Sequence, residues 1–371
     1  MGADRRTKGE GLYLRPLGLV PRSGAVEGFV PLAGGPLGFA ACEVILRAGP
    51  RTIGREILPV AALDETLRAR DPALAEAAGV RLERLGRARS PLAGLPMDRP
   101  QVMGVVNVTP DSFSDGGDRF DPGRAVAGGL EMLAAGAALL DVGGESTRPG
   151  AEPVPRCEEL RRVVPVVRGL ADQGAVVSID TRHARVMAEA LDAGAAVIND
   201  VTALAGDPES LGLAARAGVP VVLMHMQGEP RSMQDGPAYD DAALDVFDSL
   251  AARVAACEAA GIDRARIVVD PGIGFGKTVR HNLEILEQLA IYHGLGCALL
   301  LGVSRKGFIA RVSGDVPPKA RLPGSLAAAL AGLERGVQLL RVHDVAETVQ
   351  AVAVWCAIAS VRPEVARTAL S

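Results

Sequence analysis

Short apolar runs alternate with segments of helical length along most of the chain after about residue 101. The runs are rich in aliphatic and β-branched residues, the pattern of a buried strand, and the stretches between them are rich in Ala and Leu. Eight runs follow this rule: MGVVNV, ALLDVGG, VVSID, AVIND, VVLMH, IVVDP, LLLGVS and LLRVHD. We expect eight parallel strands joined by helices, with the clearest helices over 123–136 and 242–261.

The number of repeats favours one fold of the α/β class. Eight strand-helix units in a stretch of about 270 residues match the size of a (β/α)8 TIM barrel. A doubly wound sheet would more often have about five or six strands and a Gly-rich dinucleotide turn near its start. The sequence therefore predicts a TIM barrel.

The first hundred residues do not follow this alternation of strands and helices. Residues 11–50 read as short strand-like pieces broken by Gly and Pro, and residues 71–86 form a helix candidate. Three prolines cluster in 89–101, just before the first barrel strand. We expect an N-terminal accessory domain over 1–97, of unknown role, and a catalytic barrel over 98–371.

Composition and charge narrow the classes of function. The chain of 371 residues is 48% hydrophobic and has a net charge of −4. Because it lacks an overall positive charge, we do not expect it to bind nucleic acid. Its five cysteines form no C-x-x-C pair, which argues against structural zinc and for reduced thiols. No leader-like or membrane-length apolar run is visible, so we expect a cytoplasmic protein without a membrane partner.

Polar residues gather where the predicted strands end. In a TIM barrel these ends meet on one face, where active sites are built, so we expect catalysis there. A single polar residue at a strand end can instead cap a helix or satisfy a turn. The set is Asn107, Asp141, Asp180, Asn199, Asp200, His225, Asp270, Ser304, Arg341, His343 and Asp344.

Two long loops carry candidate ligands for an anion. NVTPDSFSDGG, from Asn107, delays the next helix and reads as a mobile catalytic loop. Asn107 offers a neutral oxygen to a hydrated Mg²⁺, which needs few protein ligands when a diphosphate supplies the rest. DVGGESTRPGA brings Thr147 and Arg148. Arg341 and His343, two residues apart on one strand, complete a clamp for a leaving diphosphate.

A second set of strand-end groups suits a flat heterocycle. Asp180, Asn199, Asp270 and Lys306 supply complementary hydrogen-bond donors and acceptors, although each could instead be a buried structural polar group.

The loop DPGIGFGK lacks the spacing of a nucleotide P-loop. Its Phe275, with Pro149 and the stem of Lys306, could line a slot for an aromatic substrate. We assign no catalytic role to His225, because a single histidine at a strand end is more often structural.

Together these motifs resemble the dihydropteroate synthase family over Gln101 to about Val361. The motifs are NVTPDSFSDGG, DVGGESTRPGA, SID, DPGIGFGK, SRK and RVHD, in this order. The resemblance implies a Mg²⁺-dependent transferase that joins 4-aminobenzoate to (7,8-dihydropterin-6-yl)methyl diphosphate, and a homodimer.

The resemblance also assigns roles to individual residues. It gives catalysis to Arg341, His343, Lys306 and Arg148, and metal binding to Asn107. It places Asp180, Asn199, Asp270 and Lys306 around the pterin, and Asn107, Thr147, Arg148, Arg341 and His343 on the diphosphate. It places Thr147, Pro149, Phe275 and Ser304 around 4-aminobenzoate.

Two other functions remain open. A pterin-binding methyltransferase barrel would share the heterocycle pocket, but it would not need the first two loops. A non-catalytic paralogue would bind pterin and act through its N-terminal segment.

Overall fold

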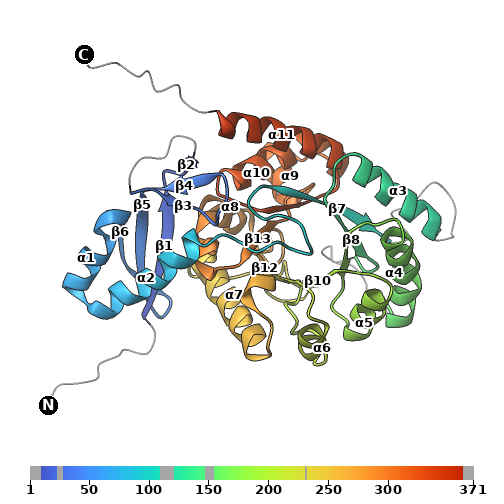
Figure 1. The fold of residues 1–371 in the computed structure, drawn as a ribbon, viewed down its shortest axis with the longest axis horizontal. Coiled ribbons are helices and arrows are strands. Elements are labelled where there is room, and N and C mark those ends of the chain that lie inside the picture. The colour runs from blue at the N-terminus through green and yellow to red at the C-terminus, as the bar shows by residue number, and fades with distance from the viewer. Residues whose placement is uncertain (1–9, 23–27, 109–120, 147–153, 230–231, 362–371) are drawn as a thin grey trace.

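The barrel predicted from the eight apolar runs is confirmed. The structure, a computed structural model, describes residues 10–22, 28–108, 121–146, 154–229 and 232–361. Eight parallel strands follow one another around a closed barrel, and the last returns to pair with the first, with Leu339 opposite Gln101 (Figure 1). They are β7 (Gln101–Asn107), β8 (Leu139–Gly143), β9 (Val177–Asp180), β10 (Val197–Asp200), β11 (Val221–Met224), β12 (Ile267–Asp270), β13 (Ala298–Leu301) and β14 (Leu339–Val342).

Helices between the strands form the outer layer of the barrel (Figure 1). The two predicted most clearly are confirmed, and each begins after an aspartate whose carboxylate accepts a backbone N–H: Asp121 before α3 and Asp241 before α7. The α-helices are α3 (Pro122–Ala134), α4 (Arg156–Ala171), α5 (Ala184–Asp192), α6 (Ser210–Ala217), α7 (Ala242–Ala259), α8 (Val279–Glu287), α9 (Gly307–Ser313), α10 (Leu322–Leu333) and α11 (Val345–Ser360). The 3₁₀-helices are η3 (Arg264–Arg266), η4 (Leu289–Leu295) and η5 (Pro318–Ala320).

The N-terminal elements form a unit with its own apolar core. An antiparallel sheet has the order β1 (Glu10–Leu17), β5 (Ala41–Ala48) and β6 (Arg51–Pro59), and a smaller one has the order β2 (Val20–Pro21), β4 (Leu37–Phe39) and β3 (Val30–Pro31). The helix predicted over 71–86 is α2 (Pro72–Gly86), capped by Asp71. Helix α1 (Val60–Arg70) was not predicted, because only Leu63 and Leu67 mark its buried face.

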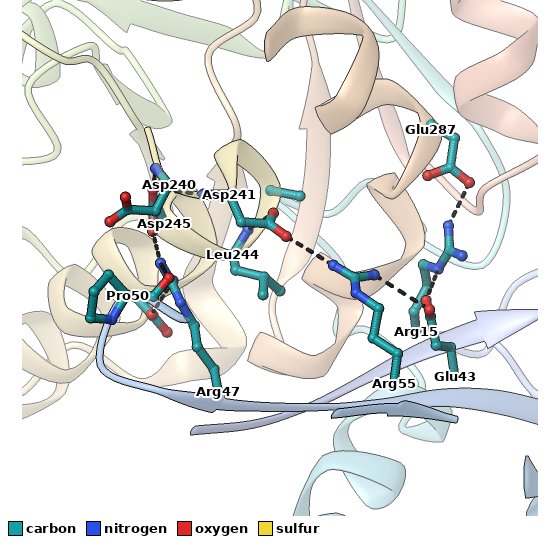
Figure 2. A network of polar contacts seen from close by, with 12 residues as sticks. Arg15, Glu43, Arg47, Pro50, Arg55, Asp240, Asp241, Leu244, Asp245 and Glu287 are labelled. Carbon is teal, nitrogen blue, oxygen red and sulfur yellow. Dashed lines mark hydrogen bonds and ion pairs between the residues drawn. The ribbon is translucent and has the colours of Figure 1, made fainter. Parts of the chain in front are cut away.

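This N-terminal unit packs on the side of the barrel formed by α7 and η4. The ring of Tyr13 meets Phe247 edge to face at 5.3 Å, and its hydroxyl lies 2.8 Å from the Asp248 carboxylate. Around this contact, Arg15, Arg47 and Arg55 of the sheet reach acidic residues of α7 and α8 (Figure 2). Burial of the rings together with these ion pairs fixes the unit to the barrel.

The segment between α2 and β7 closes the floor of the barrel. Leu92 and Met97 are almost fully buried, and they pack in one cluster with the apolar first residues of the strands, such as Leu139 and Val197. Apolar side chains thus fill the amino-terminal half of the barrel and leave its carboxyl end for polar chemistry. Among the described residues, no helix has both the length and the apolar character needed to cross a membrane.

Candidate active site

A polar layer lies directly above the apolar floor inside the barrel. Side chains two residues apart on a strand point to the same face, so Leu139 is followed inward by Asp141 and Leu339 by Arg341. The same step leads from Val197 to Asn199 and from Val268 to Asp270 on β10 and β12. Four members of the predicted strand-end set therefore converge from different strands.

Arg341 is the centre of this layer. Its Nε donates to Asp141 at 2.6 Å, and its Nη2 donates to Asp180 at 2.7 Å. The Asn199 amide donates to the same Asp141 oxygen at 2.9 Å. One guanidinium thus holds two carboxylates in place, and the amide is fixed with them.

Burial raises the pKa of Asp180 well above its usual range, to about 7. Arg341 opposes this shift, while the negative charges of Asp141, Asp200 and Glu159 add to it. A carboxylate in this setting gives up its proton readily only beside a cation. Arg341, which donates to Asp180, favours the charged carboxylate against this effect of burial.

Asp270 and Lys306 are a second pair of opposite charges at the carboxyl end of the barrel. One oxygen of the buried Asp270 accepts a hydrogen bond from the Gly272 N–H at 2.7 Å, and burial raises its pKa. Burial lowers the pKa of Lys306 to about 8, although Asp270 favours its charged form. The Lys306 ammonium lies 4.1 Å from the centre of the Phe275 ring, so the predicted aromatic slot and heterocycle pocket share this lysine.

His343 and Ser304 lie next to each other at the ends of β14 and β13. The Ser304 hydroxyl is 3.1 Å from both the backbone nitrogen and Nδ1 of His343. Burial, with Arg341 and Arg305 nearby, lowers the pKa of His343 to about 3. The ring is neutral at pH 7, and so it offers hydrogen bonds rather than charge to an anion.

Only some of the residues predicted to bind diphosphate and metal lie within the part of the chain that the structure describes. Asn107, half-buried, is the last residue of β7 and lies opposite Gly143 of β8. Thr147, Arg148 and Pro149 lie outside the described residues, as does most of the first loop. Arg341 contacts Asp141 and, from the heterocycle set, Asp180, and its predicted diphosphate role stays a prediction.

No group of three or more His, Cys, Asp or Glu side chains in the described ranges could hold a metal ion alone. A single amide oxygen at Asn107 nevertheless fits Mg²⁺ that arrives with its other ligands on a diphosphate. The residue set therefore suits a metal bound jointly with substrate and not a dedicated protein cage.

Sequence reasoning gave no role to two residues that organise the site. Asp141 was noted as a strand-end residue, and its position two residues after the floor residue Leu139 was the signal that it points inward. Lys277, at the end of DPGIGFGK, is 2% exposed and had no signal beyond its motif. Asp200 is structural, because its carboxylate accepts from the backbone of Thr202 and Leu204.

Comparison with known proteins relates the barrel to one family of enzymes. The pterin binding enzyme family matches residues 103–343. Dihydropteroate synthase of Escherichia coli K12 is 47% identical over 261 residues, which cover 70% of this chain and 92% of that protein.

Two solved structures of Xanthomonas albilineans dihydropteroate synthase are also similar. The one with 4-aminobenzoic acid has a TM-score of 0.70 and 50% identity, and it covers 74% of this chain and 98% of that one. The one with 7,8-dihydropteroate has a TM-score of 0.66 and 47% identity, over 72% and 96%. The N-terminal unit precedes the residues that the family matches.

Proposed function

This chain belongs to the pterin-binding enzyme family, and on that premise we propose that it is a dihydropteroate synthase. It condenses (7,8-dihydropterin-6-yl)methyl diphosphate with 4-aminobenzoate, giving 7,8-dihydropteroate and diphosphate. One observation carries the proposal: at the carboxyl end of the barrel, Asp180, Asn199 and Asp270 lie in one polar layer with two cations, Arg341 and Lys306.

The polar layer suits the pterin ring. A 2-amino-4-oxo pterin presents an N–C–NH₂ edge with parallel donors, and a buried carboxylate of Asp180 or Asp270 can accept both hydrogen bonds. Asn199 is held by Asp141, and its amide offers both a donor and an acceptor to the ring. Because these groups are fixed by each other, the ring is oriented without rearrangement of the protein.

Departure of the diphosphate is the step that needs most help from the protein. Positive charge that develops on the methylene is delocalised into the electron-rich pterin. The protein therefore has mainly to stabilise the negative charge on the departing diphosphate. We assign its binding to Asn107, Thr147, Arg148, Arg341 and His343. Mg²⁺, when bound to Asn107 and the diphosphate, would neutralise part of the leaving charge.

The second substrate needs no strong base. An arylamine is neutral at pH 7 and attacks the methylene directly, and the proton is lost afterwards. We propose that Phe275 and Ser304, with Thr147 and Pro149, line the slot for 4-aminobenzoate. Lys306, which lies over the Phe275 ring, then borders both substrates.

The test is an assay with purified full-length protein, Mg²⁺, and both substrates. We expect equal amounts of dihydropteroate and diphosphate, and no diphosphate when 4-aminobenzoate is omitted. Pterin binding without diphosphate release would instead favour the non-catalytic paralogue. Methyl transfer to a corrinoid would favour the methyltransferase.

We also propose a cytoplasmic homodimer. The exposed side chains of Val354, Ile358 and Val361 on and after α11 offer an apolar surface to a second copy. All five cysteines are free thiols, as a reducing compartment requires. Light scattering coupled to size-exclusion chromatography measures the oligomeric state, and a monomer at micromolar concentration would contradict the dimer.

A further inference from the structure

Lys277 is a buried lysine that ends the loop between β12 and α8. Only 2% of its surface is exposed, although lysine is rarely buried without a partner. Its ammonium contacts three acceptors: Nδ1 of His225 at 2.9 Å, the His225 carbonyl at 3.3 Å and the Phe275 carbonyl at 2.9 Å. The three donors of an ammonium are thus matched by three acceptors from two segments of the chain.

These contacts also define the state of His225. Burial lowers the pKa of Lys277 to about 7, although the charge of Asp270 opposes this shift. When Lys277 is protonated its ammonium only donates, so Nδ1 of His225 is the acceptor and the ring carries its proton on Nε2. Burial, with the charge of Lys277, lowers the pKa of His225 to about 3, so the imidazole is neutral at pH 7. Lys277 therefore ties the end of β11 to the loop after β12.

The rest of that loop is fitted closely against the segment after β11. A side chain at Gly272 would place its Cβ 1.9 Å from the His225 carbonyl oxygen, and one at Gly276 would lie 2.3 Å from that of Gln227. Both glycines also have positive φ, of 68° and 60°. Further, the Tyr239 hydroxyl donates to the Gly276 carbonyl at 2.7 Å.

The same loop supports groups that face the substrates. The Phe275 ring lies 4.1 Å below the Lys306 ammonium. A Cβ at Gly274 would lie 3.3 Å from Cδ of Lys306, so the lysine stem crosses the loop at that glycine. The position of the Phe275 backbone thus decides where the aromatic wall and the Lys306 stem lie.

We propose that Lys277 is a positioning residue for the 4-aminobenzoate slot, which acts by holding the Phe275 carbonyl and His225 so that the Phe275 ring stays under Lys306. The inference rests on the proposed function, because that function assigns Phe275 to the slot. Lys277 itself is buried, and its polar contacts are with His225 and Phe275. Its loss therefore weakens binding of 4-aminobenzoate more than it slows the reaction of bound substrates.

The test uses two variants. Lys277→Met keeps an unbranched side chain, one atom shorter, and removes the ammonium donors. Lys277→Arg keeps the charge in another shape. We expect Lys277→Met to raise KM for 4-aminobenzoate by about tenfold or more, with kcat and KM for the pterin diphosphate changed less than about threefold. Lys277→Arg should show a smaller rise. Lys319→Met, at an exposed lysine, is the control and should change none of the three constants.

A double-mutant cycle with Phe275→Ala separates positioning from general support of the fold. If Lys277 acts through Phe275, adding Lys277→Met to Phe275→Ala should raise KM for 4-aminobenzoate by less than about twofold more. Multiplicative effects, or equal losses in all three constants, would overturn the inference. Circular dichroism checks folding, and if Lys277→Met unfolds, the cycle is run with Lys277→Arg. A wild-type protein that forms no dihydropteroate refutes the proposed function instead.

Discussion

The Nε of Arg341 lies 2.6 Å from the carboxylate of Asp141, and this pair joins the last barrel strand to the second. The same Asp141 oxygen also holds the Asn199 amide, and the guanidinium also holds Asp180. Asp141 is fully buried, so its charge depends on Arg341 for compensation. Asp180 and Asn199, two of the residues that we assign to the pterin, are therefore positioned by this ion pair.

Replacement of Asp141 should disable the site without loss of shape. Asp141→Asn keeps the volume but removes the charge that orients Arg341, and Arg341 would then bind Asp180 alone. We expect kcat/KM for the pterin diphosphate to fall by about a hundredfold, which corresponds to roughly 3 kcal/mol of transition-state stabilisation. Steady-state kinetics measure this loss, with the exposed Asp192→Asn as control. A fall of less than about threefold would show that Asp141 does not organise the site.

The pH dependence of pterin binding should follow Asp180. Its pKa is raised to about 7 by burial, and the pKa of Asp270 is raised for the same reason. Protonation of a carboxylate removes an acceptor that the N–C–NH₂ edge needs. Pterin affinity should therefore fall as the pH drops from 8 to 5, whereas an ordinary carboxylate would lose its charge only near pH 4. Isothermal titration calorimetry at a series of pH values measures the trend, and a flat profile would contradict it.

The same shift has the opposite sign for stability. With its pKa raised in the folded state, Asp180 binds a proton more tightly when folded than when unfolded between about pH 7 and 4. Its contribution to the free energy of unfolding therefore increases as the pH falls through this range. Buried histidines such as His343, with a lowered pKa, act in the other direction. The contribution of Asp180 is isolated by comparing wild type with Asp180→Asn at each pH, and wild type should gain relative to the variant at low pH.

The sequence was sufficient for the barrel and for most of the residues in its polar layer, because both follow from local patterns. Strands of period two with polar residues at or next to their carboxyl ends place Asp180, Asn199 and Asp270 on one face. Partners across the barrel do not follow from such patterns. The contact between Arg341 and Asp141 joins residues 200 positions apart, and the environment of Lys277 depends on His225, 52 positions away. Closure of the barrel brings these residues together, and local patterns do not show which residues will pair across it.

The contact between the N-terminal unit and α7 should contribute measurably to stability. The side chain of Arg47 is 5% exposed and lies 2.5 Å from the Asp245 carboxylate (Figure 2). Arg68 on α1 forms an ion pair with Asp64 at an exposed site. Arg47→Met leaves Asp245 and Asp248 without their cation and should lower the free energy of unfolding by about 1 to 2 kcal/mol, because the two carboxylates are 26% and 51% exposed and stay partly hydrated. Arg68→Met, the matched control, should change it by less than about 0.5 kcal/mol. Chemical denaturation compares the two, and equal effects would mean that the unit is held by apolar contacts alone.

The floor of the barrel predicts where the N-terminal part can be removed. A variant that starts at Arg87 loses Tyr13, and with it the edge-to-face contact on Phe247, but keeps Leu92 and Met97 in the floor. A variant that starts at Asp98 loses these two side chains as well. Burial of an aliphatic side chain of this size contributes about 1.5 to 3 kcal/mol, so the second variant should be less stable than the first by roughly 3 kcal/mol or more. Thermal unfolding followed by circular dichroism measures the order, which we expect to be full chain, then the Arg87 start, then the Asp98 start. Equal melting temperatures for the two shortened proteins would show that the segment from Leu92 to Met97 is not a structural part of the barrel.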